Sequence, residues 1–75
     1  MNAQTELKPY DEIRTAKNAY KLIVESGRSI ESVALDIQAS DRLIYYWANG
    51  DRSPNIKHLY ALSQLFQVPI ESILG

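Results

Sequence analysis

Residues 29–50, SIESVALDIQASDRLIYYWANG, contain two short segments with helical spacing of apolar residues, joined by a very short connection. Ser29 precedes the first segment and Ser40 precedes the second. Serine is a preferred N-cap because its hydroxyl accepts a hydrogen bond from a free amide of the first helical turn. Asn49 and Gly50 end the second segment, since both tolerate a left-handed backbone. The stretch therefore predicts two capped helices, the second from about residue 41 to 49.

The apolar residues of this stretch share one side of each predicted helix. The inward positions are Ile30, Val33, Ala34, Ile37, Ile44 and Trp47. The small Ala34 allows the second helix to cross closely, and Ala39 lies in the tight connection. Two helices joined in this way are a helix-turn-helix motif. In such a motif the first helix lies across the DNA backbone, and the second places its N-terminal residues in the major groove.

The flanking sequence predicts three further helices. Asp11 and Glu12 suit the positive end of a helix that continues over about 13–26 and stops at Gly27. A fourth helix is expected over 56–66, and 70–74 suit one last turn. The expected inward residues of these helices are Ala16, Ala19, Tyr20, Ile23, Val24, Ile56, Leu59, Leu62, Leu65 and Phe66. Because no segment alternates like a strand, the predicted fold is all-α, a compact bundle of five short helices.

The length of 75 residues indicates one domain. We expect a flexible N-terminal arm at 1–10 and a helix-turn-helix domain at 11–75, with the motif at about 29–50. This organisation is expected to leave no room for a ligand-sensing domain. The first residues lack the apolar segment of a signal peptide, and no apolar run is long enough to cross a membrane. These features favour a cytoplasmic location.

Composition argues against several classes of function. The chain has no cysteine and one histidine, so we expect neither a disulfide nor a metal site, and no cofactor. His58 has no evident nucleophile partner and is expected on a helix surface, so the sequence predicts no enzyme. The net charge of −1 is unusual for a DNA-binding protein. The distribution of charge therefore matters more than its sum.

The run GRSIESVALDIQASDRLIYYWANGDRSP, residues 27–54, resembles the lambda-repressor/Cro-like (XRE-type) helix-turn-helix family. The positions that fit the family pattern without gaps are Gly27, Ser29, Val33, Ala34, Ile37, Ala39, Ser40, Ile44, Trp47, Asn49, Gly50, Arg52 and Pro54. The similarity extends over about 16–74. It implies a lambda-repressor-like DNA-binding domain that acts in transcription regulation.

Two positions depart from the family pattern. Family members often carry glutamine directly after the serine that starts the first motif helix, and its amide braces a phosphate. This chain has Ile30 there, so that contact is lost. Ala48 stands where the family often has glutamate before Asn-Gly.

The second motif helix carries the expected base-reading residues. Arg42 can make a bidentate contact with guanine, and Asp41 can accept from cytosine or orient Arg42. Tyr45 can offer its hydroxyl to a phosphate or its ring to a thymine methyl. The structural alternatives are that Asp41 stabilises the helix start and that Arg42 is an ordinary surface residue.

A second group of residues is expected at the DNA backbone. The candidates for phosphate binding are Ser29, Ser40, Tyr46, Asn49, Arg52 and Lys57. Each has a structural alternative. The two serines can simply cap helices, and Asn49 can simply end one. Tyr46 can pack against the fourth helix, and Arg52 can be a solvated loop charge.

The predicted function is a sequence-specific DNA-binding transcriptional regulator, either a stand-alone Cro-like repressor or an antitoxin-like regulator. Its partner is double-stranded DNA, and we expect no small-molecule substrate. We expect a homodimer that uses Ile70, Ile73 and Leu74, although these side chains can also close the monomer core. The alternative is a protein-interaction module with the same fold. A basic rim of Arg28, Arg42, Arg52 and Lys57 around Tyr45 favours DNA, and an acidic or apolar patch there favours a protein partner.

Overall fold

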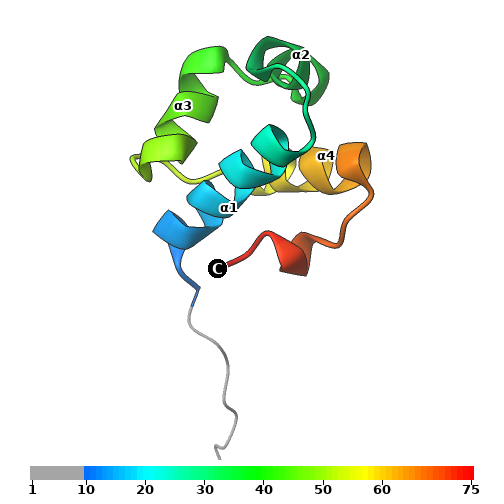
Figure 1. The fold of residues 1–75 in the computed structure, drawn as a ribbon. Helices are drawn as coiled ribbons and strands as arrows, with labels where there is room; N and C mark the ends of the chain where they lie inside the picture. Colours follow the sequence, from blue (N-terminus) through cyan, green and yellow to red (C-terminus); the bar gives the residue numbers. More distant parts are fainter. Residues whose placement is uncertain (1–9) are drawn as a thin grey trace, which may run out of the picture.

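The computed structural model describes residues 10–75 and contains four α-helices and one 3₁₀ turn, with no strand among these residues. The elements are α1 (Glu12–Glu25), α2 (Ile30–Ile37), α3 (Asp41–Asn49), α4 (Ile56–Phe66) and η1 (Ile70–Ser72). The predicted all-α bundle of five short helical elements is confirmed (Figure 1). The expected N-terminal arm lies outside the described residues except for Tyr10, whose hydroxyl is 3.3 Å from the Ser53 hydroxyl.

Each α-helix begins at a polar residue whose side chain accepts a hydrogen bond from the amide three residues later. The caps are Asp11, Ser29, Ser40 and Asn55. The two serines that the sequence indicated are thus confirmed as N-caps. Such a cap satisfies one of the amides that a helix start leaves without a partner.

Left-handed residues end all four α-helices. Gly27 and Gly50 have φ of +79° and +78°, as expected from the sequence. Gln38 and Gln67 have φ of 60° and 55°, which no pattern in the sequence indicated. The reversal after Gln38 lets the Ala39 amide donate to the Ala34 carbonyl at 2.8 Å. This bond closes the tight connection between α2 and α3.

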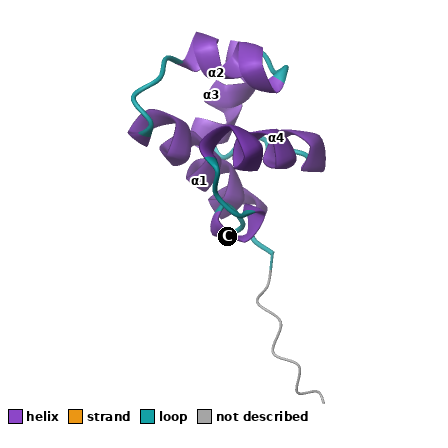
Figure 2. Ribbon diagram, turned by 90° about the vertical axis from the view of Figure 1, so that its right-hand side faces the viewer, coloured by secondary structure: helices purple, strands orange, loops and turns teal. Residues whose placement is uncertain are grey.

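The core is formed by apolar side chains from every α-helix. Its buried members are Ala16, Ala19, Ile23, Val33, Ala34, Ile37, Ile44, Trp47, Leu59, Leu62 and Ile73. Helix α1 packs mainly against α3, and α2 packs against both α3 and α4. In Figures 1 and 2 the motif helices α2 and α3 lie together at one end of the molecule, away from the C-terminus. Within the described residues no helix is long and apolar enough to cross a membrane.

Three side chains differ from the sequence expectation. Val24 is 52% exposed, because it follows the buried Ile23 and points about 100° away from it around α1. Ile56 is 71% exposed, because it is the first residue of α4 and lies at the edge of the bundle. His58, expected at the surface, is only 8% exposed because α4 turns it towards Trp47.

The C-terminal segment closes the bundle beside the start of α1 (Figure 1). The Gly75 amide donates to the Thr15 hydroxyl at 2.8 Å, and the Asp11 amide donates to the Gly75 carbonyl at 3.2 Å. Ile73 is 2% exposed and belongs to the core. Of the apolar residues considered for a dimer contact, Ile73 therefore serves the monomer core.

Candidate nucleic-acid interface

Helix α3 is fixed in the domain by its buried face. Ile44 and Trp47 are fully buried, and they lie three residues apart on one side of the helix. The Trp47 ring meets the His58 ring of α4 edge-on, with the ring centroids 5.8 Å apart. Trp47 Nε1 and His58 Nδ1 have no hydrogen-bond partner within residues 10–75. The contact between α3 and α4 at this point is therefore made by the two rings and not by a hydrogen bond between them.

The opposite face of α3 is directed away from the core. Arg42, Tyr45, Tyr46 and Asn49 recur at intervals of three, four and seven residues, so they form one surface along the helix. Arg42, Tyr45 and Asn49 are exposed, and Tyr46 is half-buried. Asp41, also exposed, lies at the first position of the helix beside Arg42. The expected base-reading residues thus lie together near the N-terminal end of an accessible helix face.

The two serines act as helix caps, which was the structural alternative for both. Ser29 Oγ accepts from the Ser32 amide at 3.1 Å, and Ser40 Oγ accepts from the Leu43 amide at 3.0 Å. A hydroxyl that accepts one bond still has its own proton to donate. Both side chains are exposed, so capping and phosphate binding are compatible at these positions.

The chain after α3 folds back over the last turn of that helix. The Asp51 amide donates to the Tyr46 carbonyl at 2.9 Å, next to the left-handed Gly50. Arg52 Cζ then lies 5.2 Å from the centre of the Tyr46 ring, a cation–π contact. Arg52 is exposed and also contacts the Tyr46 ring, so its side chain has a neighbour on α3. The sequence did not indicate this contact, because the contact depends on the backbone reversal at Gly50.

The cations near α3 differ in their availability. Arg28 forms an ion pair with Asp36 and a hydrogen bond with the Ser32 hydroxyl, so its charge is less available than the predicted basic rim requires. Arg42, Arg52 and Lys57 are exposed and form no ion pair with any residue from 10 to 75. The exposed carboxylates of Asp41 and Asp51 lie beside Arg42 and Arg52 in the sequence. The surplus of positive charge is small, so one chain can neutralise few phosphates, which predicts weak binding with a shallow salt dependence per chain.

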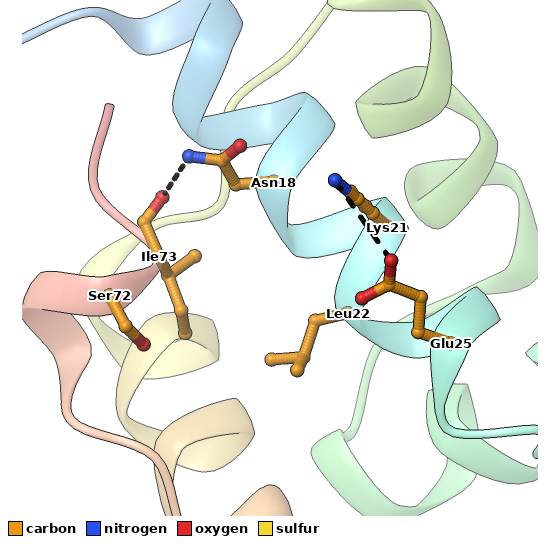
Figure 3. Close-up of a pocket in the computed structure, with 6 residues that line it drawn as sticks. All are labelled: Asn18, Lys21, Leu22, Glu25, Ser72 and Ile73. Carbon is orange, nitrogen blue, oxygen red and sulfur yellow. Dashed lines mark hydrogen bonds and ion pairs between the residues drawn. The ribbon is translucent and has the colours of Figure 1, made fainter.

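A shallow pocket of about 230 Å³ lies between α1 and the C-terminal segment (Figure 3). Its lining residues are Asn18, Lys21, Leu22, Glu25, Ser72 and Ile73. The Asn18 amide donates to the Ile73 carbonyl at 3.0 Å, and Lys21 pairs with Glu25 at 3.9 Å. Of these two contacts, the Asn18 bond joins α1 to the C-terminal segment, whereas Lys21 and Glu25 both belong to α1. In the described part of the chain, histidine and acidic residues form no group suited to a metal ion.

Residues 20–73 match the protein family described as helix-turn-helix. The match covers more than half of the chain, so the protein belongs to this XRE-type, lambda-repressor/Cro-like family. The resemblance found in the sequence is thereby confirmed, and the chain carries a DNA-binding domain of the XRE type. No curated protein and no solved structure matched the chain.

Proposed function

We propose that this protein is a sequence-specific transcriptional regulator that reads duplex DNA with the exposed face of α3. It acts in the cytoplasm, as a Cro-like repressor or as an antitoxin-like regulator, and it has no enzymatic activity. The observation that carries the proposal is the two-sided construction of α3. Its inner face is locked by Trp47, and its outer face presents Arg42 without an ion pair among residues 10–75. A rigid helix with an available arginine near its N-terminus suits base reading in the major groove.

The residues have distinct roles in this proposal. Arg42 reads a guanine, Asp41 orients Arg42 or accepts from cytosine, and Tyr45 contacts a thymine methyl. The phosphates are bound by Ser29, Ser40, Asn49, Arg52 and Lys57, and Tyr46 belongs to this surface through its contact with Arg52. Ile30 lies at the start of α2 where the family often has glutamine, so orientation on DNA depends more on the remaining phosphate contacts.

We further propose that the protein binds its operator as a homodimer, because one recognition helix covers only a half-site. The C-terminal segment has less apolar surface for this contact than the sequence implied. Ile73 is buried, and Ile70 is half-buried, which leaves Leu74 as the exposed member of the set. Sedimentation of the protein with and without operator tests the dimer, and one chain per operator at high concentration contradicts it.

Selection of bound sites from random duplex DNA tests the proposed function. The expected result is enrichment of a palindrome with half-sites about one helical turn apart, which supports both base reading and dimerisation. Enrichment of a single short site supports base reading by a monomer. The absence of any enrichment, with no binding at low salt, contradicts the proposed function.

A protein-interaction module is the second candidate function. The observation that favours it is the exposure of large apolar side chains, with Leu35 on α2 and Ile56 and Tyr60 on α4. Ile56 and Tyr60 lie four residues apart, so they share one side of α4. Substitution of both by serine distinguishes the candidates. If the double variant still binds DNA, the result supports the regulator. If neither wild type nor the double variant binds any duplex, the result supports the interaction module.

A further inference from the structure

We propose that Tyr46 and Arg52 form a single phosphate-binding unit, in which the tyrosine ring positions the guanidinium and the guanidinium binds a DNA phosphate. This inference rests on the proposed function, because it names how one part of the same surface meets its ligand. Tyr46 is a positioning residue in this unit. The sequence alone indicated only two independent phosphate contacts.

The backbone after α3 creates the unit. Gly50 adopts a left-handed conformation that a residue with a Cβ rarely takes, and the Asp51 amide then bonds back to the Tyr46 carbonyl at 2.9 Å. The reversal returns Arg52 over the last turn of α3, with its Cζ 5.2 Å from the Tyr46 ring centre. Two residues that are six positions apart in the sequence thereby meet on the outer face of α3.

The cation–π contact suits an arginine that binds phosphate. This contact needs no N–H···O hydrogen bond, so the N–H donors of the guanidinium can still bind phosphate oxygens. No side chain or carbonyl among residues 10–75 forms a hydrogen bond or ion pair with the Arg52 donors. Phosphate oxygens accept such donors in pairs. The unit is therefore a cation that is held in place while its hydrogen-bonding capacity is still unused.

The ring also lowers the entropic cost of binding. A free arginine loses rotamer freedom when it meets a phosphate, whereas a stacked arginine has lost part of that freedom already. Half-burial of Tyr46 keeps the ring itself in place. Lys57 provides the internal contrast, because it is an exposed cation at the start of α4 with no aromatic contact in the described part of the chain.

A double-mutant cycle tests the unit. Dissociation constants for one duplex are measured at several salt concentrations for wild type, Tyr46→Leu, Arg52→Ala and the double variant. We expect Tyr46→Leu to weaken binding about two- to fivefold, the range for an exposed cation–π contact. Arg52→Ala lowers the salt slope by about one unit per subunit. In the Arg52→Ala background, Tyr46→Leu has no further effect. The matched control is Lys57→Ala, whose effect adds to that of Tyr46→Leu.

Two further variants separate the role of the ring from the roles of the tyrosine hydroxyl and of the positive charge. Tyr46→Phe keeps the ring, and we expect it to bind DNA like wild type. If Tyr46→Phe instead loses as much affinity as Tyr46→Leu, the tyrosine hydroxyl makes the contact and the unit is overturned. Arg52→Lys keeps the charge without the planar group and weakens binding, so wild-type affinity for this variant also overturns the unit. Both variants keep an aromatic ring at position 46, so they still test the unit if Tyr46→Leu fails to fold.

The side-chain proton resonances of Arg52 in the free protein provide a readout that does not depend on DNA. We expect a ring-current shift in wild type and Tyr46→Phe that disappears in Tyr46→Leu. The unit is overturned if the losses of affinity from Tyr46→Leu and Arg52→Ala are additive, or if wild type shows no ring-current shift. In either case the proposed function still stands as long as wild type binds DNA. Absence of binding to any duplex at low salt overturns both.

Discussion

The two faces of α3 obey different physical requirements within the same nine residues. On the inner face, Ile44 and Trp47 are fully buried against neighbouring helices. On the outer face, Arg42 and Tyr45 are exposed, and no hydrogen bond within residues 10–75 holds their side chains. The inner face therefore fixes where the helix lies, and the outer face is left available for a ligand. Stability and binding should accordingly be separable by substitution in this one helix.

The largest expected effect comes from breaking the inner face. Trp47→Ala should lower the free energy of unfolding by about 3–5 kcal/mol, because it leaves a cavity between α3 and α4. A loss of this size threatens the fold of so small a domain. Tyr45→Ala is the matched control on the outer face, with an expected change within about 0.5 kcal/mol. Urea titration followed by circular dichroism measures both, and equal losses for the two variants contradict the division into faces.

The inner face is also the part of the molecule that sequence predicts well. Apolar residues at helical spacing must be buried somewhere in a short chain, so Ile44 and Trp47 could be assigned to the core without coordinates. The serine caps and the two left-handed glycines follow from local backbone chemistry in the same way. These features depend on residues that are close in the sequence.

The other features of the fold and of the candidate site depend on side-chain contacts that the spacing of residue types in the sequence does not define. His58 is buried because Trp47 of another helix lies against it, and Ile56 is exposed because no element covers the start of α4. The pairing of Arg28 with Asp36 removes a cation from the predicted interface. The stacking of Arg52 on Tyr46 adds a contact that the sequence pattern does not contain. Side-chain pairing at a surface is a tertiary property, so the candidate site could be predicted as a set of residues but not as an arrangement.

A smaller effect is expected at the end of α3. Gly27 and Gly50 have nearly the same φ, but their surroundings differ. A Cβ at Gly50 would lie 3.0 Å from Ile13 Cγ2, whereas a Cβ at Gly27 would meet nothing within 4 Å. Gly27→Ala should therefore cost about 1 kcal/mol from the left-handed backbone alone. Gly50→Ala should cost about 2 kcal/mol, because crowding adds to the same strain. Thermal unfolding of both variants measures the difference, and equal costs would show that Ile13 moves aside freely.

The smallest expected effect is at the start of α3, where the two faces meet. Ser40→Ala should cost about 1 kcal/mol of stability through loss of the cap, and Ser40→Gly only a few tenths. If the hydroxyl also donates to a phosphate, both variants weaken DNA binding equally although their stabilities differ. Chemical denaturation and duplex titration of the pair separate the roles. If the affinity for DNA falls in proportion to the loss of stability in the two variants, Ser40 acts only as a helix cap.

Substitution of Arg42 tests most directly whether the outer face of α3 reads the base sequence. Wild type and Arg42→Ala are titrated against the selected operator and a scrambled duplex at several salt concentrations, with Lys57→Ala as the control for a cation assigned to phosphate. Arg42→Ala should cost about 1–3 kcal/mol on the operator and reduce the preference for operator over scrambled DNA. Lys57→Ala should weaken both duplexes alike. Equal weakening of the two duplexes by Arg42→Ala would contradict the assignment of α3 as the recognition helix.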